Sequence, residues 1–554
     1  MIKIKFFLAW CVLLCVPVVM ACTLNWTLIF FAQVCLISLL SLAATQALLV
    51  RFQYFALVMF PFMLWVPIEI GYLLKYRQAA SPHIFAILSE SNWDEVLGFV
   101  NVEQLVIFVI YGAVLIFCLV GSGYRWVHRS RYWVAIAAGT YIGGLTWAQS
   151  SLESKVSFEL DHFGDHPGEG SVGADRLWAS YPASVIVRFL DYLKQQRVIA
   201  QSKTQLEHIK SSATKKKSED KEVYIVVIGE SSRRNHWSLY GYEKPTTPLL
   251  QNIPNLIAWQ DVISVSGATR TSVPVLLGRN TVDEVLKGQL GASWINEFKA
   301  QGFKTYWFSN QMEIGTHDTA IGVYAGLVDK KKFINLGYYG VTASYDADLL
   351  PLVRNALAEP TAKKLIVVHT LGSHSPYQNR YPIEYDFFKP SVSRDVDSAL
   401  SNMDKQGPLK NSYDNSIRYT DYVLSTLFTL PELASSYAAV WYVSDHGETF
   451  LADGCKTFGH GFTAKYNFQI PALFWYSDSY GALNLDIVNQ AKLASALPYS
   501  AQQFYDAVLH SAGFDGVDEG LFSIKQEVKS RLIWPTDKSG SIDFDEYFKE
   551  KICD

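Results

Sequence analysis

Carboxylate and imidazole side chains stand just after three short apolar runs of the sequence. They are Glu230, His369, His374, Asp445 and His446, and His460 follows the last pair closely. Carboxylate oxygens and imidazole nitrogens are donors that suit zinc. A single Asp-His pair is more often structural than functional. Three strand ends that carry such groups together favour a metal site.

A segment rich in hydroxyl groups, Ser266–Pro274, overlaps the short apolar stretch Val273–Leu277. The beginning of a helix offers N–H groups and a positive dipole end to a phosphate. A hydroxyl placed there beside a metal ion can ionise and attack phosphorus. The alternative is that a serine or threonine of this segment simply caps the helix. The residues alone favour the cap.

The elements that must position these groups form an alternating pattern. Apolar runs at 223–228, 305–308, 365–368 and 438–443 each end in polar residues, and helix-like stretches such as Ser416–Phe428 separate them. Buried parallel strands that alternate with helices predict a doubly wound α/β sheet. Catalytic groups of such sheets gather beyond the carboxyl ends of the strands. The reactive side chains stand in those places.

The charges of the 554-residue chain are unevenly distributed, since only 13 of the 100 charged side chains fall in the first 150 residues. The first part resembles a membrane protein and the rest a soluble one. This excludes a purely cytosolic enzyme and a disordered chain. The net charge is −4, and the sequence lacks the clustered positive charge that binding to a nucleic acid requires. We expect a transmembrane domain over 1–150, a membrane-surface linker over 151–220 and a catalytic domain over 221–554.

Five apolar stretches are candidates for membrane-spanning helices. They are Phe6–Ala21, Leu28–Val50, Tyr54–Leu74, Leu105–Val120 and Trp133–Trp147. Lysines and arginines near the helix ends place the N-terminus in the cytoplasm and everything after about residue 148 outside it. In a bacterium with two membranes this predicts an inner-membrane protein with a periplasmic catalytic domain. A cleaved lipoprotein signal ending at Cys22 is an alternative for the first stretch.

Two features near the membrane leave alternatives open. Glu69 lies inside the third predicted span, where an acid indicates either a function or a side chain that reaches the interface. In the linker, Ile186, Phe189, Leu190 and Leu193 share one helical face opposite Arg188. That pattern predicts a helix on the bilayer surface or packed on the catalytic domain.

Several short motifs follow one another along the chain. The first is Val227–Arg233 with Leu239–Tyr242 and Thr247-Pro248. The later ones are Gly372–Tyr377, Tyr413–Ile417 with Tyr419–Tyr422, Ser444–Glu448 and Gly459–Gly461. These motifs and their order resemble those of the bacterial phosphoethanolamine transferases, which belong to the sulfatase branch of the alkaline phosphatase superfamily. The five-span anchor and the external catalytic domain match the same family. The resemblance covers nearly the whole chain and is most specific over 223–480.

The resemblance implies roles for individual residues. Thr269 resembles the threonine that becomes phosphorylated, because Ser272-Val273-Pro274 follows it at the family's spacing. The ligands of a tightly bound zinc ion are matched by Glu230, Thr269, Asp445 and His446. His374 and His460 match residues that hold the phosphoethanolamine group or a second zinc. Ser91 and Glu95 loosely resemble loop positions that bind the donor lipid.

The implied reaction is a double displacement. Thr269 attacks phosphatidylethanolamine, diacylglycerol leaves, and an acceptor hydroxyl then takes phosphoethanolamine from the threonine. The acceptor is lipopolysaccharide core, lipid A or a periplasmic glucan, and the chain is expected to act as a monomer. A glycerol-phosphate transferase, a phosphohydrolase of the same superfamily and a non-catalytic membrane-anchored binding protein are the alternatives.

The sequence departs from the lipid A enzymes in two respects. Their soluble domains hold several disulfides, whereas only Cys455 and Cys553 of this chain belong to the external part, where they could form one bridge. A stretch that supplies a substrate-binding lysine in the lipid A branch reads Trp307–Gln311 here, followed by His317. This favours the branches that act on lipopolysaccharide core or glucans, and leaves His317 as a substrate contact or a plain surface residue.

Overall fold

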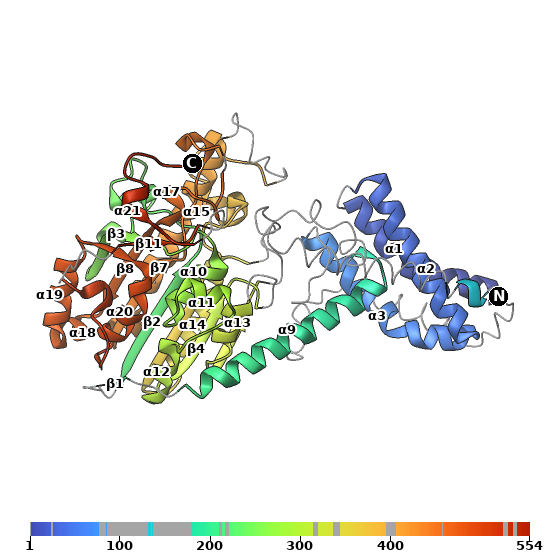
Figure 1. Ribbon diagram of the computed structural model, residues 1–554, viewed down its shortest axis with the longest axis horizontal. Helices are drawn as coiled ribbons and strands as arrows, with labels where there is room; N and C mark the ends of the chain where they lie inside the picture. Colours follow the sequence, from blue (N-terminus) through green and yellow to red (C-terminus); the bar gives the residue numbers. More distant parts are fainter. Residues whose placement is uncertain are drawn as a thin grey trace. The chain divides into compact units, whose positions relative to one another are not determined.

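The computed structural model of the chain describes two compact units, Met1–Gln195 and Gln196–Asp554, which are considered separately below (Figure 1). The described residues are 2–23, 26–76, 85, 131–134, 136, 179–209, 213–215, 221–313, 319–335, 344–394, 406–456, 458–524, 530–535 and 540–553.

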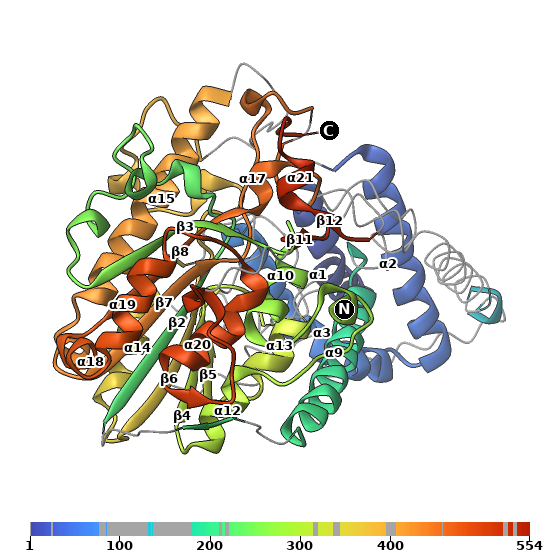
Figure 2. The same ribbon diagram turned by 60° about the vertical axis from the view of Figure 1, so that its left-hand side comes forward.

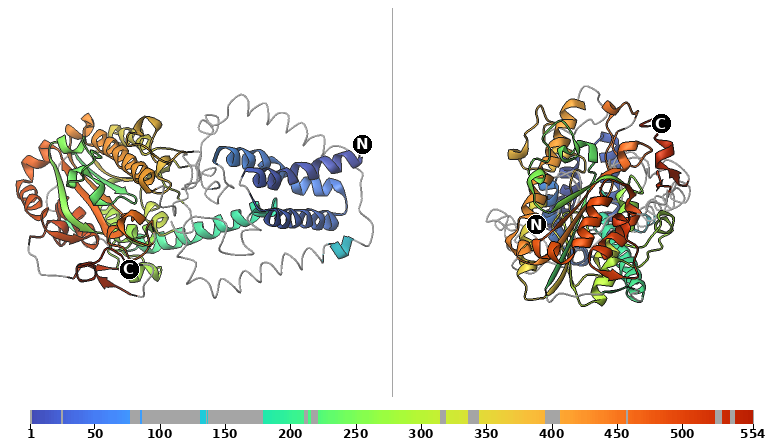
Figure 3. Two further views of the ribbon diagram at one scale, coloured as in Figure 1. Left: turned by 90° about the horizontal axis from the view of Figure 1, so that it is seen from above. Right: turned by 90° about the vertical axis from the view of Figure 1, so that its left-hand side faces the viewer.

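Three apolar helices pack together in the first unit: α1 (Ile2–Thr23), α2 (Leu28–Leu49) and α3 (Phe52–Tyr76) (Figure 3). Two stretches, Leu28–Leu49 and Phe52–Gly71, are long and apolar enough to cross a membrane. They correspond to the second and third predicted spans. The apolar part of α1, Trp10–Cys22, is shorter. The predicted fourth span, and all but three residues of the fifth, lie outside the described residues.

The amphipathic pattern in the linker correctly predicted a helix, α9 (Ala183–Glu207). Its predicted apolar face is half exposed at Ile186, Phe189 and Leu190, although the Phe189 ring contacts Phe85 with 5.2 Å between ring centres. Arg188 on the opposite face is buried and forms an ion pair with Glu69 of α3 over 2.9 Å. The acid in the third predicted span therefore has a structural partner.

The second unit is built on a sheet of eight strands in the order β5-β4-β6-β2-β7-β8-β3-β9. The strands are β2 (Glu222–Gly229), β3 (Leu256–Ile263), β4 (Lys304–Ser309), β5 (Lys330–Phe333), β6 (Lys363–His369), β7 (Tyr437–Ser444), β8 (Gln469–Tyr476) and β9 (Pro498–Ser500). The four predicted runs are the neighbouring strands β4, β6, β2 and β7, and all four are parallel. The α/β class is confirmed. The sheet is mixed, however, because β8 runs antiparallel to both β7 and β3.

Helices cover both faces of this sheet (Figure 2). They are α10 (Thr269–Leu277), α11 (Val282–Leu286), α12 (Trp294–Ala300), α13 (Thr319–Ala325), α14 (Leu350–Ala358), α15 (Gln406–Phe428), α16 (Pro431–Ala434), α17 (Lys465–Phe468), α18 (Asp478–Leu483), α19 (Leu485–Ala494), α20 (Phe504–Ser511) and α21 (Phe544–Tyr547). Short strand pairs flank the sheet: β1 (Thr214–Lys215) with β10 (Phe514–Asp515), and β11 (Leu532–Ile533) with β12 (Ile542–Asp543).

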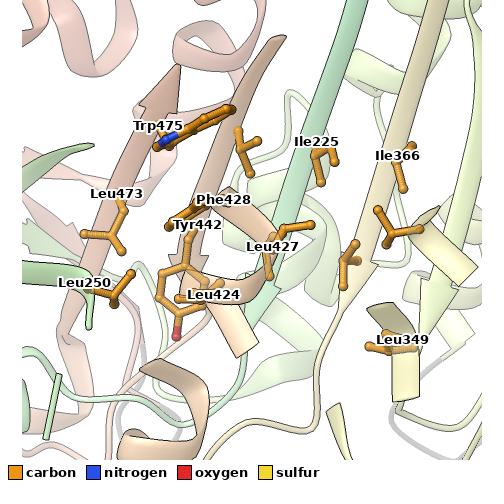
Figure 4. Packing of buried hydrophobic residues seen from close by; sticks show 14 of the residues in the cluster. Ile225, Leu250, Leu349, Ile366, Leu424, Leu427, Phe428, Tyr442, Leu473 and Trp475 are labelled. Carbon is orange, nitrogen blue, oxygen red and sulfur yellow. The ribbon is translucent and has the colours of Figure 1, made fainter. Parts of the chain in front are cut away.

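The larger core lies between the sheet and α15. Strand residues alternate between the two faces, so Ile225 and Tyr442 point toward α15 while Tyr224 and Trp441 point the other way. Figure 4 shows Leu424, Leu427 and Phe428 of α15 lying against side chains of β2, β6, β7 and β8. The Phe428 ring stacks on Trp475 with 6.0 Å between ring centres. Burial on both faces explains why the central strands are apolar without alternation.

A disulfide joins Cys455 to Cys553, with 5.7 Å between their Cα atoms. It fastens the C-terminal segment to the loop that follows β7, where Lys465 N–H also donates to the carbonyl of Ile552 at 2.7 Å. The bridge that the sequence left open is thus present.

Cys553→Ser is expected to destabilise the second unit by about 4 kcal/mol, because the bridge closes a loop of 98 residues and restricts the unfolded chain accordingly. Thermal unfolding of the purified chain, followed by intrinsic fluorescence, measures this loss. Dithiothreitol should lower the wild-type midpoint and leave that of the variant unchanged. Equal midpoints for the oxidised wild type and the variant would contradict the prediction.

Candidate active site

Parallel pairing brings together two candidate metal-ligating residues, Glu230 and Asp445, that lie 215 residues apart in the sequence. Gly229, at the end of β2, is in register with Ser444, at the end of β7, so Glu230 and Asp445 follow adjacent strand ends. The N–H of Asp445 donates to the carbonyl of Gly229 at 3.1 Å. The N–H of Ser231 donates to Asp445 Oδ1 at 3.0 Å. The backbone therefore holds the two carboxylates side by side.

Glu230, Asp445 and His446 each offer a ligand atom, and these three atoms lie within 4.8 Å of one another. All three side chains are buried. His446 Nε2 lies 3.4 Å from Glu230 Oε1 and 3.3 Å from Asp445 Oδ2. The Nδ1–H of His446 donates to the carbonyl of Gly447 at 2.9 Å. Because a carbonyl can only accept, this bond leaves the lone pair of Nε2 directed at the carboxylates.

The electrostatics of this cluster fit a divalent cation. Burial raises the pKa of Asp445 to about 6 and also raises the pKa of Glu230, which lies beside Asp445. Burial lowers the pKa of His446 to about 4, so its ring is neutral. Asp445 Oδ2 is buried and receives no hydrogen bond from the described residues. Two buried carboxylates and a neutral imidazole are a zinc donor set, and a cation would offset the cost of burying their charge.

Thr269 completes the cluster. Its Oγ1 lies 3.1 Å from Glu230 Oε2 and 3.1 Å from His446 Nε2. Thr269 is the first residue of α10, and Ala268 occupies the cap position. The hydroxyl therefore does not cap the helix, contrary to the simpler interpretation of this segment. It is aimed at the metal-ligating residues from the positive end of the helix dipole.

The neighbouring hydroxyl groups are engaged elsewhere. Thr271 Oγ1 donates to Ser266 Oγ at 2.6 Å and lies 3.0 Å from the carbonyl of Ala268. Ser272 Oγ donates to that same carbonyl at 3.0 Å. Both side chains are buried. The geometry thus singles out Thr269 as the nucleophile candidate of the segment.

His374 and His460 lie beside this centre, as expected. The ring centre of His460 is 4.4 Å from that of His446 and 5.9 Å from that of His374. The Nδ1–H of His374 donates to the carbonyl of Ser375 at 2.6 Å. His460 Nδ1 lies 3.2 Å from Glu448 Oε2. Each ring thus has its Nδ1 engaged within the protein, which fixes the orientation of the ring.

Three supporting residues escaped the sequence reasoning. Gln311 Nε2 donates to Glu230 Oε2 at 3.0 Å and to the carbonyl of Thr370 at 2.9 Å. Ser231 Oγ donates to Glu230 Oε1 at 2.7 Å. Gly372 has a φ of +49°, and a Cβ there would lie 2.6 Å from the carbonyl of Glu230. Only glycine fits this close approach. The sequence did offer a signal for Gln311, because it belongs to the polar residues that directly follow β4, where site residues of such sheets gather.

Comparison with known proteins agrees with this centre. The family model described as Sulfatase matches residues 222–514, which include every strand of the central sheet.

The chain belongs to the sulfatase family. Its relatives include the phosphoethanolamine transferase EptC of Escherichia coli K12, 25% identical over 496 residues that cover 86% of this chain and 83% of EptC. The phosphoethanolamine transferase OpgE of the same bacterium is 31% identical over 261 residues, 46% of each chain. The crystal structure of the C-terminal periplasmic domain of E. coli EptC in complex with zinc superposes with a TM-score of 0.53. It shows 26% identity over 62% of this chain and 98% of that domain. Within the sulfatase family the chain is a member of the phosphoethanolamine transferases.

Ser91, Glu95 and His317 lie outside the described residues. His369 is described and buried, but it is absent from the metal-ligating cluster. Its ring packs edge-on against Trp307, and its Nε2 has no hydrogen-bond partner among the described residues. Of the histidines near strand ends, His369 therefore belongs to the core.

His369 should make the domain sensitive to acid. Burial lowers its pKa to about 3, below the value of about 6.5 in an unfolded chain. The unfolded state therefore binds the proton first as pH falls. We expect the wild type to lose about 1.4 kcal/mol relative to His369→Phe for each pH unit below 6.5. Unfolding midpoints from pH 7.5 to 5 test this, and parallel pH profiles would refute it.

Proposed function

We propose that this protein transfers phosphoethanolamine from phosphatidylethanolamine to a glycan or lipopolysaccharide acceptor of the cell envelope, through a phosphothreonine at Thr269. The observation that carries the proposal is the Thr269 hydroxyl, 3.1 Å from both a buried glutamate and a buried neutral histidine. The relatives EptC and OpgE are phosphoethanolamine transferases, which supports phosphoethanolamine as the group transferred. The sequence at 307–311 differs from the stretch that supplies a substrate-binding lysine in the lipid A branch. This difference favours lipopolysaccharide core or glucan over lipid A as the acceptor.

Glu230, Thr269, Asp445 and His446 would hold one tightly bound zinc ion. A zinc ion bound there would lower the pKa of the Thr269 hydroxyl and polarise a phosphoryl oxygen. The zinc bound in the EptC domain supports this choice of metal. His374 and His460 would bind the phosphoethanolamine group or a second zinc. Gln311 and Ser231 orient Glu230 through their hydrogen bonds to its two oxygens.

Thr269 reacts after its hydroxyl has lost its proton to solvent. In the first step the deprotonated Thr269 Oγ1 forms a bond to phosphorus while the bond from phosphorus to the diacylglycerol oxygen breaks, and the second step restores the deprotonated Oγ1. His460, whose Nδ1 is held by Glu448, would donate the proton that the leaving oxygen needs. In the second step an acceptor hydroxyl attacks phosphorus and gives its proton to the same imidazole, and the bond to Thr269 breaks. His374 would clamp phosphoryl oxygens in both steps.

The location follows from the donor. Phosphatidylethanolamine is a membrane lipid, and the apolar helices α2 and α3 would keep the catalytic unit at the inner membrane. The corresponding domain of EptC is periplasmic, which supports a periplasmic catalytic unit here. The five-span topology, and the contacts of Ser91 and Glu95 with donor lipid, remain predictions.

The test uses the purified full chain in vesicles that contain either phosphatidylethanolamine or phosphatidylglycerol, each labelled in its headgroup. Formation of diacylglycerol and of labelled protein only with phosphatidylethanolamine would support the proposal. Labelling from phosphatidylglycerol would instead indicate a glycerol-phosphate transferase. Release of free phosphoethanolamine without labelled acceptor would indicate a hydrolase. Mass spectrometry of lipid A, core oligosaccharide and glucans from cells with and without the protein would identify the acceptor.

A further inference from the structure

Arg188 at the start of α9 is 2% exposed, and Glu69 of α3 is fully buried. Arg188 Nη1 donates to Glu69 Oε1 at 2.9 Å. Its Nε and Nη2 donate to the carbonyl and the hydroxyl of Ser184, one helical turn earlier. Trp65 Nε1 donates to the other glutamate oxygen at 3.1 Å. Both charges are thus surrounded by partners, as buried charges must be.

Hydrogen bonds just before α9 show how deep this segment lies along the apolar helices. The hydroxyl of Tyr181 donates to the carbonyl of Phe62, about 15 Å along α3 from its beginning at a rise of 1.5 Å per residue. Ser180 Oγ donates to the carbonyl of Val34 in α2 at 3.4 Å. Glu69 is about 25 Å along α3. The chain at 180–188 therefore lies beside the part of α3 that would cross a hydrocarbon core of about 30 Å.

The opposite face of this part of α9 is apolar and exposed. Ile186, Phe189 and Leu190 are 48%, 43% and 58% exposed. A helix in water buries its apolar side chains and exposes its polar ones, so this part of α9 shows the reverse pattern. Inside a membrane, ionisable side chains face the protein and pair with one another. Leu57 and Leu64 of α3 are also exposed, at 65% and 47%, so α3 and α9 share this character.

We propose that the first two turns of α9 lie inside the outer part of the lipid bilayer, held to α3 by the Arg188–Glu69 pair, with Ile186, Phe189 and Leu190 in contact with phospholipid acyl chains. The segment before the catalytic unit is then a part of the membrane anchor that the hydropathy of the sequence does not reveal, because Arg188 and its neighbours lower the apolar character. The positive-inside rule, which places Arg51 in the cytoplasm, puts Glu69 and Arg188 toward the outer end of α3.

Site-directed spin labelling tests this inference. The five cysteines of the membrane segments are replaced by serine, and single labels are introduced through Ile186→Cys, Phe189→Cys and Leu190→Cys in the full chain in lipid nanodiscs. Greater relaxation by oxygen than by a water-soluble nickel complex is expected at all three positions, as at Leu57→Cys. Greater relaxation by nickel would place the face in water and overturn the proposal. Low accessibility to both would show protein cover and overturn it equally.

Two controls calibrate these labels. Leu493→Cys replaces a leucine that is 65% exposed on α19 of the catalytic unit, so its label should favour nickel. Val185→Cys replaces a buried residue of the same helix, so its label should be shielded from both reagents. The labels report solvent and lipid without reference to enzyme activity.

The ion pair has its own measurement. In a bilayer, Glu69→Leu should leave an uncompensated charge and sharply lower the yield of folded monodisperse protein, and adding Arg188→Met should restore most of that yield. Removing one partner of a buried ion pair is strongly destabilising, so single variants with wild-type yield would contradict the pairing. A double variant no better than Glu69→Leu would also count against the pairing.

Discussion

Thr269→Ala is expected to reduce phosphoethanolamine transfer on the order of 10³-fold or more, because it removes the atom that forms the bond to phosphorus. The fold should persist. Thr269 is not buried, and its hydroxyl neither caps α10 nor bonds the backbone among the contacts described here. Alanine is also favourable in a helix. Transfer is measured with headgroup-labelled phosphatidylethanolamine, and the unfolding midpoint is measured beside it.

Trapping the intermediate makes this prediction specific. The wild-type chain incubated with donor lipid and no acceptor should carry phosphoethanolamine on the peptide that contains Thr269, and the alanine variant should not. Thr269→Ser, which keeps a hydroxyl, should retain measurable transfer. Ser272→Ala should retain most activity, since Ser272 Oγ bonds the carbonyl of Ala268. Full transfer by Thr269→Ala would remove the proposed nucleophile.

Asp445→Asn should lower zinc affinity at least about 100-fold and abolish transfer with it. The variant removes the negative charge from a buried oxygen, Oδ2, that receives no hydrogen bond from the described residues. Oδ1 accepts from the N–H groups of Ser231 and His446 at 3.0 and 2.6 Å. Asparagine can keep an oxygen there, so the loss should be electrostatic rather than structural.

Zinc content by elemental analysis and competition with a chelator measure this effect. Asp453→Asn is the matched control, because Asp453 is an acid paired with Arg233 at 2.7 Å and is not part of the metal-ligating cluster. It should retain zinc. Zinc bound equally by the wild type and Asp445→Asn would show that the metal lies elsewhere.

The strands that were predicted are those whose apolar runs end in polar, chemically capable residues. β2, β4, β6 and β7 satisfy this, and their pairing follows from the rules for parallel sheets. β8 contains Pro471, which is unusual in a central strand, and its antiparallel direction is set by neighbours distant in sequence. Helix α9 was recognised by the helical spacing of its apolar side chains. Which of its faces is buried depends on whether water or lipid surrounds the helix, and the spacing does not reveal this.

The candidate metal-ligating residues were predicted from two sources: the chemistry of the carboxylate and imidazole groups after the strands, and the family resemblance for Thr269. Glu230, Thr269, Asp445 and His446 converge as expected, and His374 and His460 lie beside them. Gln311 was not foreseen, since its contact with Glu230 spans 81 residues and depends on β4 lying next to β6 and β6 next to β2. An amide side chain carries no chemical signature that would reveal such a contact from sequence.

The pairing of β2 with β7 has a consequence for how the protein is made. The ribosome synthesises Glu230 well before Asp445, 215 residues later, and pairing over such a separation requires closing a long loop. A partly synthesised chain therefore presents Glu230 and Thr269 without the Asp-His pair that completes the candidate site. On the proposed function, a metal ion would be captured only after the sheet closes, so incomplete chains would neither hold the metal nor react with lipid.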